Sequence, residues 1–143
     1  MQERGFTAKR SITINVPPAK VWDALVNPEM IKQYLFGTEA ISNWKVGDSI
    51  TYRGTWEGKS YEDKGKILQL IPERIFQSTY WSSMSGTEDK PENYATVTYE
   101  IESRPSGTLL TVSQDNNASK EASEHSEKNW GMVLETMKKI IEK

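Results

Sequence analysis

The chain has 143 residues, of which 36% are hydrophobic, a net charge of −2 and no cysteine. This length is typical of one domain with a sizeable core, so we expect a single domain over residues 1–143, and the sequence lacks both the basic runs of nucleic-acid-binding proteins and the thiols needed for disulfides. The polar N-terminus lacks the apolar core of a signal peptide and no run approaches the roughly 20 apolar residues of a membrane span, so we expect a cytoplasmic protein with no membrane span.

The N-terminal part of the chain predicts one strand and two short helices. Residues 11–16 alternate between polar and apolar side chains, as in a strand with one buried face, and Pro17-Pro18 ends that strand. Pro18 suits the first turn of a helix, whose apolar residues keep helical spacing until Asn27-Pro28 interrupts it. Residues 29–36 predict a second short helix.

The middle of the chain predicts an antiparallel meander, because turn-forming residues separate successive strand patterns. The expected strands cover residues 49–57, 61–71, 74–81, 94–103 and 108–114, after a shorter strand near 38–44. Residues 82–93 are polar and predict a surface loop. The strand at 74–81 leaves open which face is buried, because two alternating sets compete: Ile75, Gln77 and Thr79 against Phe76, Ser78 and Tyr80.

The last part of the chain predicts one long amphipathic helix over residues 119–142, with Asn117 and Ser119 as candidate N-caps. Its buried stripe begins with serines and continues with large side chains: Ser119, Ser123, Ser126, Trp130, Val133, Leu134, Met137 and Ile141. Large side chains can seal a core against a sheet, whereas serines leave space that a compact core would fill. We therefore expect this helix to close one side of a cavity; a core helix whose serines touch loops is the alternative.

This order of elements predicts an α+β fold in which a curved antiparallel sheet covers its apolar face with the last helix. Alternation places Ile50, Tyr52 and Trp56 on one face of their strand, and Val97 and Tyr99 on one face of theirs. Aromatic residues on a concave sheet make a plausible wall for an apolar ligand. The candidate cavity residues are Trp44, Ile50, Tyr52, Trp56, Val97, Tyr99, Ser123, Ser126, Trp130, Val133 and Met137.

Four segments resemble bacterial proteins of the heat-shock-chaperone ATPase activator type: VPPAKVWDAL at 16–25, GKILQLIP at 65–72, LTVSQDN at 110–116 and EASEHSEKNWGMVLETMKKIIE at 121–142. The resemblance implies the START-like (SRPBCC, Bet v-like) helix-grip fold, with two short helices after the first strand. Members of that superfamily commonly hold lipids, sterols, polyketides or other hydrophobic molecules between the sheet and the C-terminal helix. The match also implies that Trp130, Val133, Leu134, Met137 and Ile141 face the sheet, and it supplies no catalytic residue.

The sequence contains no residue pattern typical of a catalytic or metal site. His125 is the only histidine and lies at the flank of the buried stripe, so we expect a structural or exposed histidine rather than a general base. Glu88, Asp89 and Glu92 lack the spacing of an EF-hand loop and predict a solvated loop. Strand alternation places Arg53 on the face opposite Tyr52 and Trp56, so we expect its side chain on the outer face of the sheet. We expect no catalytic residue, no metal and no cofactor.

The sequence thus predicts a binding protein that holds a hydrophobic small molecule of lipid, polyketide or aromatic type. Two alternatives stay open: a protein-interaction module or chaperone accessory that uses the outer sheet surface, and a cyclase-like or hydratase-like enzyme. A buried polar group with a perturbed pKa would favour the enzyme, and a contiguous exposed apolar patch would favour the interaction module. Self-association and contact with a chaperone stay open as well.

Overall fold

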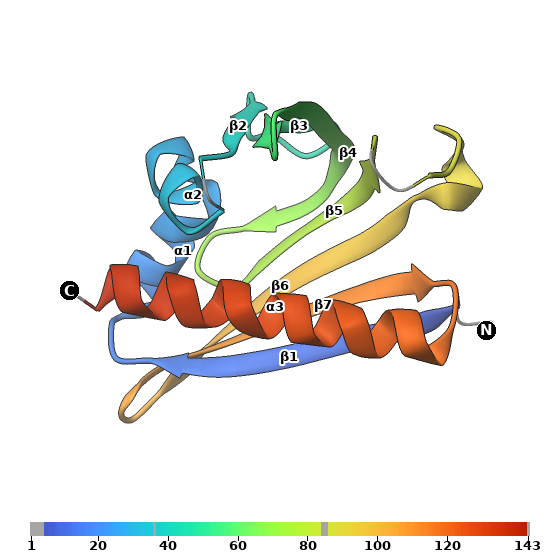
Figure 1. Cartoon of the computed structure of the whole chain (residues 1–143). Helices are drawn as coiled ribbons and strands as arrows, with labels where there is room; N and C mark the ends of the chain where they lie inside the picture. Colours follow the sequence, from blue (N-terminus) through green and yellow to red (C-terminus); the bar gives the residue numbers. More distant parts are fainter. Residues whose placement is uncertain (1–4, 36, 84–85, 143) are drawn as a thin grey trace.

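The computed structural model describes residues 5–35, 37–83 and 86–142, and within them a seven-stranded antiparallel sheet curves around one long helix (Figure 1). The strands follow the order β1-β7-β6-β5-β4-β3-β2 across the sheet. The α+β helix-grip fold predicted from the sequence is confirmed. In chain order the elements are β1 (Phe6–Ile14), α1 (Pro18–Val26), α2 (Pro28–Tyr34), β2 (Glu39–Ser42), β3 (Ser49–Trp56), β4 (Lys59–Ile71), β5 (Ile75–Ser82), a short 3-10 turn (Pro91–Asn93), β6 (Ala95–Arg104), β7 (Gly107–Asn117) and α3 (Lys120–Ile141).

The long helix α3 packs on β1 and β7 and meets α1 and α2 near its C-terminal end (Figure 1). Of the two candidate caps, Ser119 begins the helix: its Oγ accepts a hydrogen bond from the Ala122 backbone N–H at 3.1 Å, as N-cap serines do. Asn117 is instead the last residue of β7.

The two short helices form the predicted pair, with small shifts at their ends. Asn27 caps α2 by accepting from the Glu29 backbone N–H at 3.0 Å, so α2 begins at Pro28, one residue earlier than predicted. Tyr34 ends α2, and its hydroxyl donates to the Ala24 carbonyl of α1 at 2.8 Å. Phe36, which the prediction included, lies outside the described residues. The hydroxyl bond ties α2 to α1.

The main core lies between the sheet and the second half of α3. Leu134 and Met137 of α3 are fully buried there. On β5, Phe76 and Ser78 are buried, which settles the face that the sequence left open. The Phe76 ring stacks on Tyr99 with ring centres 5.8 Å apart. An apolar core of this kind supplies most of the favourable free energy of folding.

The sheet bends at β4, where the pairing with β5 shifts register between Ile67 and Gln69. Gly65 lies just before this bulge, and a Cβ added there would stand 1.7 Å from the Thr79 backbone oxygen. The Lys66 backbone N–H donates to Thr79 Oγ1 at 2.9 Å in the same place. Bulges increase local bending, and only glycine permits so close a backbone approach.

Strand β1 lies at one edge of the sheet, with β7 as its neighbour on the other side. Charged side chains of α3 hydrogen-bond to backbone groups of β1: Glu127 accepts from Lys9 N at 3.3 Å, and Lys138 donates to the Thr13 carbonyl at 2.8 Å. Just beyond the two elements, Glu142 accepts from Asn15 N at 2.7 Å. Unpaired edge strands can recruit other chains, and charged groups placed on them reduce this. The helix therefore covers part of an edge that would otherwise be open.

Candidate functional site

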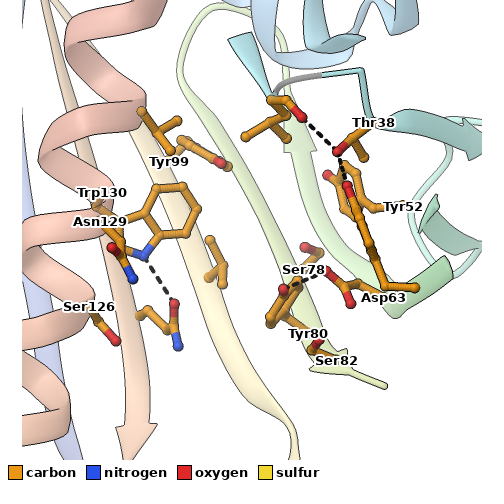
Figure 2. A pocket seen from close by; sticks show the side chains of 15 residues that line it. Thr38, Tyr52, Asp63, Ser78, Tyr80, Ser82, Tyr99, Ser126, Asn129 and Trp130 are labelled. Carbon is orange, nitrogen blue, oxygen red and sulfur yellow. Dashed lines mark hydrogen bonds between the residues drawn. The ribbon is translucent and has the colours of Figure 1, made fainter. Parts of the chain in front are cut away.

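A cavity of about 610 Å³ lies between α3 and the concave face of the sheet (Figure 2). Its walls come from α3, from β3 to β7, and from the connection between α2 and β2. It is lined by Leu35, Thr38, Tyr52, Tyr61, Asp63, Ser78, Tyr80, Ser82, Val97, Tyr99, Gln114, Ser126, Asn129, Trp130 and Val133.

The helix wall of the cavity is built around Trp130. Its Nε1 donates a hydrogen bond to Gln114 Oε1 at 3.0 Å. The indole also meets the Tyr99 ring edge to face, with centroids 5.8 Å apart and planes at 88°. Such a T-shaped pair is favourable because the ring edge carries positive charge and the ring face negative charge. Two independent contacts therefore hold the indole in one orientation against the cavity.

Ser126 has a second role besides leaving room in the cavity. Its hydroxyl donates to Asn117 Oδ1 at 2.8 Å, and Asn117 Nδ2 donates to the backbone oxygens of Phe6 and Gln114 at 2.9 and 3.0 Å. Asn117 is buried, so these bonds satisfy an amide that would otherwise lose its partners. The serine thus joins α3 to the ends of β1 and β7 while adding little volume.

The strand wall carries more polar groups than the helix wall. Thr38 Oγ1 donates to the Leu35 carbonyl at 2.7 Å and also hydrogen-bonds to the Tyr61 hydroxyl. The Tyr80 hydroxyl donates to Asp63 Oδ2 at 2.7 Å. A side-chain hydrogen bond joins Ser82 to Tyr80 as well. A short chain of hydrogen bonds thus runs from β5 to the Asp63 carboxylate on β4.

Burial changes the ionisation of the tyrosines in this region. Desolvation raises the pKa of Tyr52 and of Tyr99 well above the usual value. The pKa of Tyr80 is also raised, first by burial and then by the charge of Asp63 and the hydrogen bond to it. These phenols are therefore neutral at physiological pH, and that of Tyr80 acts as a hydrogen-bond donor to Asp63.

One oxygen of Asp63 has no hydrogen-bond partner in the part of the chain that the structure describes. Its Oδ1 atom is buried and accepts no hydrogen bond from any residue that the structure describes. A buried acceptor left unpaired carries a desolvation penalty of about 1–3 kcal/mol, and more when it is charged. Native structures contain few such groups, so this oxygen requires an explanation.

One known protein family matches nearly the whole chain. The model of the Activator of Hsp90 ATPase homolog 1-like protein family matches residues 15–142. The chain belongs to this family. The resemblance drawn from the sequence is therefore confirmed, including its place in the START-like superfamily. No curated protein was found to match the chain.

Solved structures include a relative similar in sequence and others similar in fold. A protein from Cytophaga hutchinsonii has 44% identity and a TM-score of 0.86, covering 99% of this chain and 97% of its own. An Aha1 dimer from Colwellia psychrerythraea has 18% identity and a TM-score of 0.76, covering 96% of both chains. A protein from the dynemicin biosynthetic locus has 13% identity and a TM-score of 0.79, covering 95% of this chain and 47% of its own. The last two support the fold alone.

Some of the residues predicted to form the cavity line it, and others lie in the core. Tyr52, Val97, Tyr99, Ser126, Trp130 and Val133 line the cavity. Ile50, Met137 and Ser123 are buried but do not line it. Trp44 packs against the core, with its ring 6.1 Å from that of Phe76. The side chain of Trp56 lies outside the described residues. That any of these residues contacts a ligand stays a prediction.

Among the polar residues of the strand wall, Asp63 was not predicted from the sequence, and the face of Tyr80 was left open. A usable signal exists: counting back in twos from the buried Ile67 places Gly65, Asp63 and Tyr61 on the same face of β4. Once Phe76 is known to face inward, the same count along β5 reaches Ser78 and Tyr80. Polar residues at inward positions of a strand are therefore the feature that could have identified this wall.

The other polar residues singled out in the sequence lie away from the cavity lining. His125 is exposed, and Arg53 is exposed and pairs loosely with Glu62 at 3.9 Å. Asp89 pairs with Lys64 on the surface. Among the described residues, no three His, Cys, Asp or Glu side chains gather in a way that could hold a metal ion. None of the described helices is both long enough and apolar enough to cross a bilayer.

Proposed function

We propose that this chain binds a hydrophobic small molecule, of lipid, polyketide or aromatic type, in the cavity between the sheet and α3. The observation that carries the proposal is the cavity itself: its volume of about 610 Å³ lies within the usual range of ligand pockets. Aromatic side chains supply much of its lining. The residues expected to contact the ligand are Tyr52, Val97, Tyr99, Ser126, Trp130 and Val133.

The proposed mechanism is capture and sequestration. Trp130 and Tyr99 on one side and Tyr52 and Tyr80 on the other offer rings to a flat apolar molecule (Figure 2). Burying the apolar area of such a ligand stabilises the complex by about 25 cal/mol per Å². The free-energy cost of the translational and rotational freedom lost on binding is subtracted from this gain. We propose the cytoplasm as the compartment in which this occurs.

The two alternatives have less support. The perturbed groups in the cavity are tyrosines whose raised pKa keeps them protonated, so they would not act as bases at neutral pH. The exposed large apolar side chains are spread over β1, β2, the β2–β3 connection, β4 and α3: Phe6, Ile41, Val46, Leu68, Ile71 and Met132. Binding inside the cavity therefore remains the better account.

Ser126→Phe tests the proposal directly. The added ring should enter the cavity and abolish binding of a fluorescent fatty-acid analogue while the protein stays folded. Ser126→Ala is the matched control, because it loses the same hydrogen bond to Asn117, worth about 1 kcal/mol, without filling space. His125→Ala, at the exposed neighbouring position, should leave the affinity for the analogue unchanged.

Native mass spectrometry of the protein purified from its own host would identify the ligand, as a small molecule of defined mass retained by the folded chain. A wild-type protein that never binds the analogue, together with a Ser126→Phe variant that melts far earlier than Ser126→Ala, would show that the site is closed and overpacked. That pair of results would end the cavity proposal.

A further inference from the structure

The cavity has two walls of different chemistry. On the helix side, Trp130, Val133 and the Tyr99 ring present apolar surface. On the strand side, Asp63, Ser78 and Tyr80 present polar atoms, and Figure 2 shows them across the cavity from Trp130. Among the described residues that line the cavity, Asp63 is the only aspartate, glutamate, lysine, arginine or histidine.

Several hydrogen-bond donors of the lining are already used within the protein. Thr38 gives its proton to the Leu35 carbonyl, so the Tyr61 hydroxyl donates to Thr38. The Tyr80 hydroxyl donates to Asp63 Oδ2, and the Trp130 indole donates to Gln114. These donors are therefore not available to Asp63 Oδ1, which remains a buried acceptor without a partner in the described chain.

The surroundings of Asp63 favour a cation over a neutral donor. No lysine, arginine or histidine is among the described residues that line the cavity, so no side chain of the lining neutralises the carboxylate. Tyr52 is the cross-strand partner of Asp63, and Tyr80 is hydrogen-bonded to it, so two aromatic residues are direct neighbours of Asp63. Carboxylates and aromatic faces together are the groups that stabilise a bound ammonium ion.

We propose that the cavity selects amphipathic ligands in which a flat apolar body carries a protonated amine, and that the amine donates to Asp63 Oδ1. The proposal rests on the binding function proposed above and names the ligand class. In the complex, the apolar body lies against Trp130 and Tyr99, and the ammonium group pairs with the carboxylate on the opposite wall. Asp63 Oδ1 thereby gains the partner that none of the described residues gives it.

Three naphthalene probes of one size separate charge from shape: 2-naphthylmethylamine, 2-naphthalenemethanol and 2-naphthoate, which are cationic, neutral and anionic at pH 7. Isothermal titration calorimetry of the wild-type protein should rank the amine first and the carboxylate last, with at least a tenfold difference between them. Asp63→Asn should weaken binding of the amine about tenfold, equivalent to about 1.4 kcal/mol, and change binding of the alcohol less than twofold.

Two matched variants serve as controls. Glu62→Gln removes the neighbouring carboxylate, which points to solvent with more than half of its side chain exposed, and should leave all three affinities unchanged. Tyr80→Phe removes the donor to Oδ2 but keeps the Asp63 carboxylate, so the preference for the amine should persist.

The outcomes distinguish this proposal from the one on which it rests. Equal binding of the amine and the alcohol, tightest binding of naphthoate, or an amine preference that survives Asp63→Asn would overturn the assignment of Asp63 while leaving a ligand cavity in place. Failure of all three probes to bind would overturn both. If Asp63→Asn does not fold, the wild-type order of affinities still decides the matter.

Discussion

Trp130 joins α3 to the sheet through an indole N–H bond to Gln114 and an edge-to-face contact with Tyr99. We expect Trp130→Ala to lower the free energy of unfolding by about 3 kcal/mol, at the lower end of the range for aromatic truncations in cores, because one side of the ring faces the cavity. Trp130→Phe keeps an aromatic ring and loses the N–H bond, so its loss should be about 1 kcal/mol.

Urea unfolding followed by circular dichroism measures both variants on one scale. A loss below about 1 kcal/mol for Trp130→Ala would mean that neither contact contributes to stability, and the register of α3 against the sheet would then need revision.

How far single residues could be predicted depends on their polarity. Trp130 and Tyr99 follow apolar periodicity, which sequence reasoning reads well. Asp63 was missed because a carboxylate within a strand is normally taken as solvent-facing, and its inward position breaks that rule. Residues that violate a local rule are expected at functional sites. Prediction from sequence patterns is therefore least accurate for the residues of such a site.

At the scale of elements, Gly65 determines how closely β4 and β5 approach at the bend. Gly65→Ala should destabilise the fold by more than about 3 kcal/mol or prevent folding, because the new methyl group would meet the Thr79 backbone at 1.7 Å. Gly58→Ala is the matched control: Gly58 has a positive φ of 79° but open space around the added Cβ, so only conformational strain of about 1 kcal/mol is expected.

Thermal unfolding of the two glycine variants separates steric conflict from backbone strain. Equal losses at Gly65 and Gly58 would show that β4 and β5 can move apart at low cost, and the tight bend would then contribute little to the shape of the cavity.

Element boundaries were predicted well where side chains alternate in polarity and poorly where backbone pairing alone extends a strand. β1 begins at Phe6 rather than at residue 11, and β7 continues to Asn117 rather than ending at Gln114. Phe6 pairs with Asn117 across the two strands, and Asp115 Oδ1 accepts from the Thr96 backbone N–H at 2.6 Å. Polar residues take part in these strand extensions, so the extensions have no alternating hydrophobic pattern from which they could be predicted.

At the scale of the whole molecule, the buried tyrosines make stability depend on alkaline pH. Burial raises the pKa of Tyr34, Tyr52, Tyr80 and Tyr99, so the folded state keeps protons that the unfolded chain releases above about pH 10. The stability contributed by the neutral phenols is complete below that pH and is lost as the pH rises. Each such tyrosine should lower the free energy of unfolding by about 1.4 kcal/mol per pH unit until its own folded-state pKa is reached.

Urea unfolding at pH 8, 9.5, 10.5 and 11 checks this expectation, with tyrosinate absorbance near 295 nm recorded at the same time. The unfolded fraction at a given urea concentration and the tyrosinate absorbance should rise together as the pH increases. If all the tyrosines ionise near pH 10 while the protein stays folded, these phenols are open to solvent and the tight packing around them is contradicted.

The position of β1 also has a consequence for synthesis on the ribosome. The first strand pairs with β7, and its other edge meets side chains of α3 up to 125 residues further along the chain. Long-range pairing of this kind slows folding because the intervening loop must close first. A nascent chain can assemble the β2–β6 meander as it emerges, but β1 must wait, with both edges unpaired, until the last two elements leave the exit tunnel. The sheet therefore closes only after translation of α3, and a chain stalled before that point presents an open edge strand to whatever chaperone or neighbouring chain is at hand.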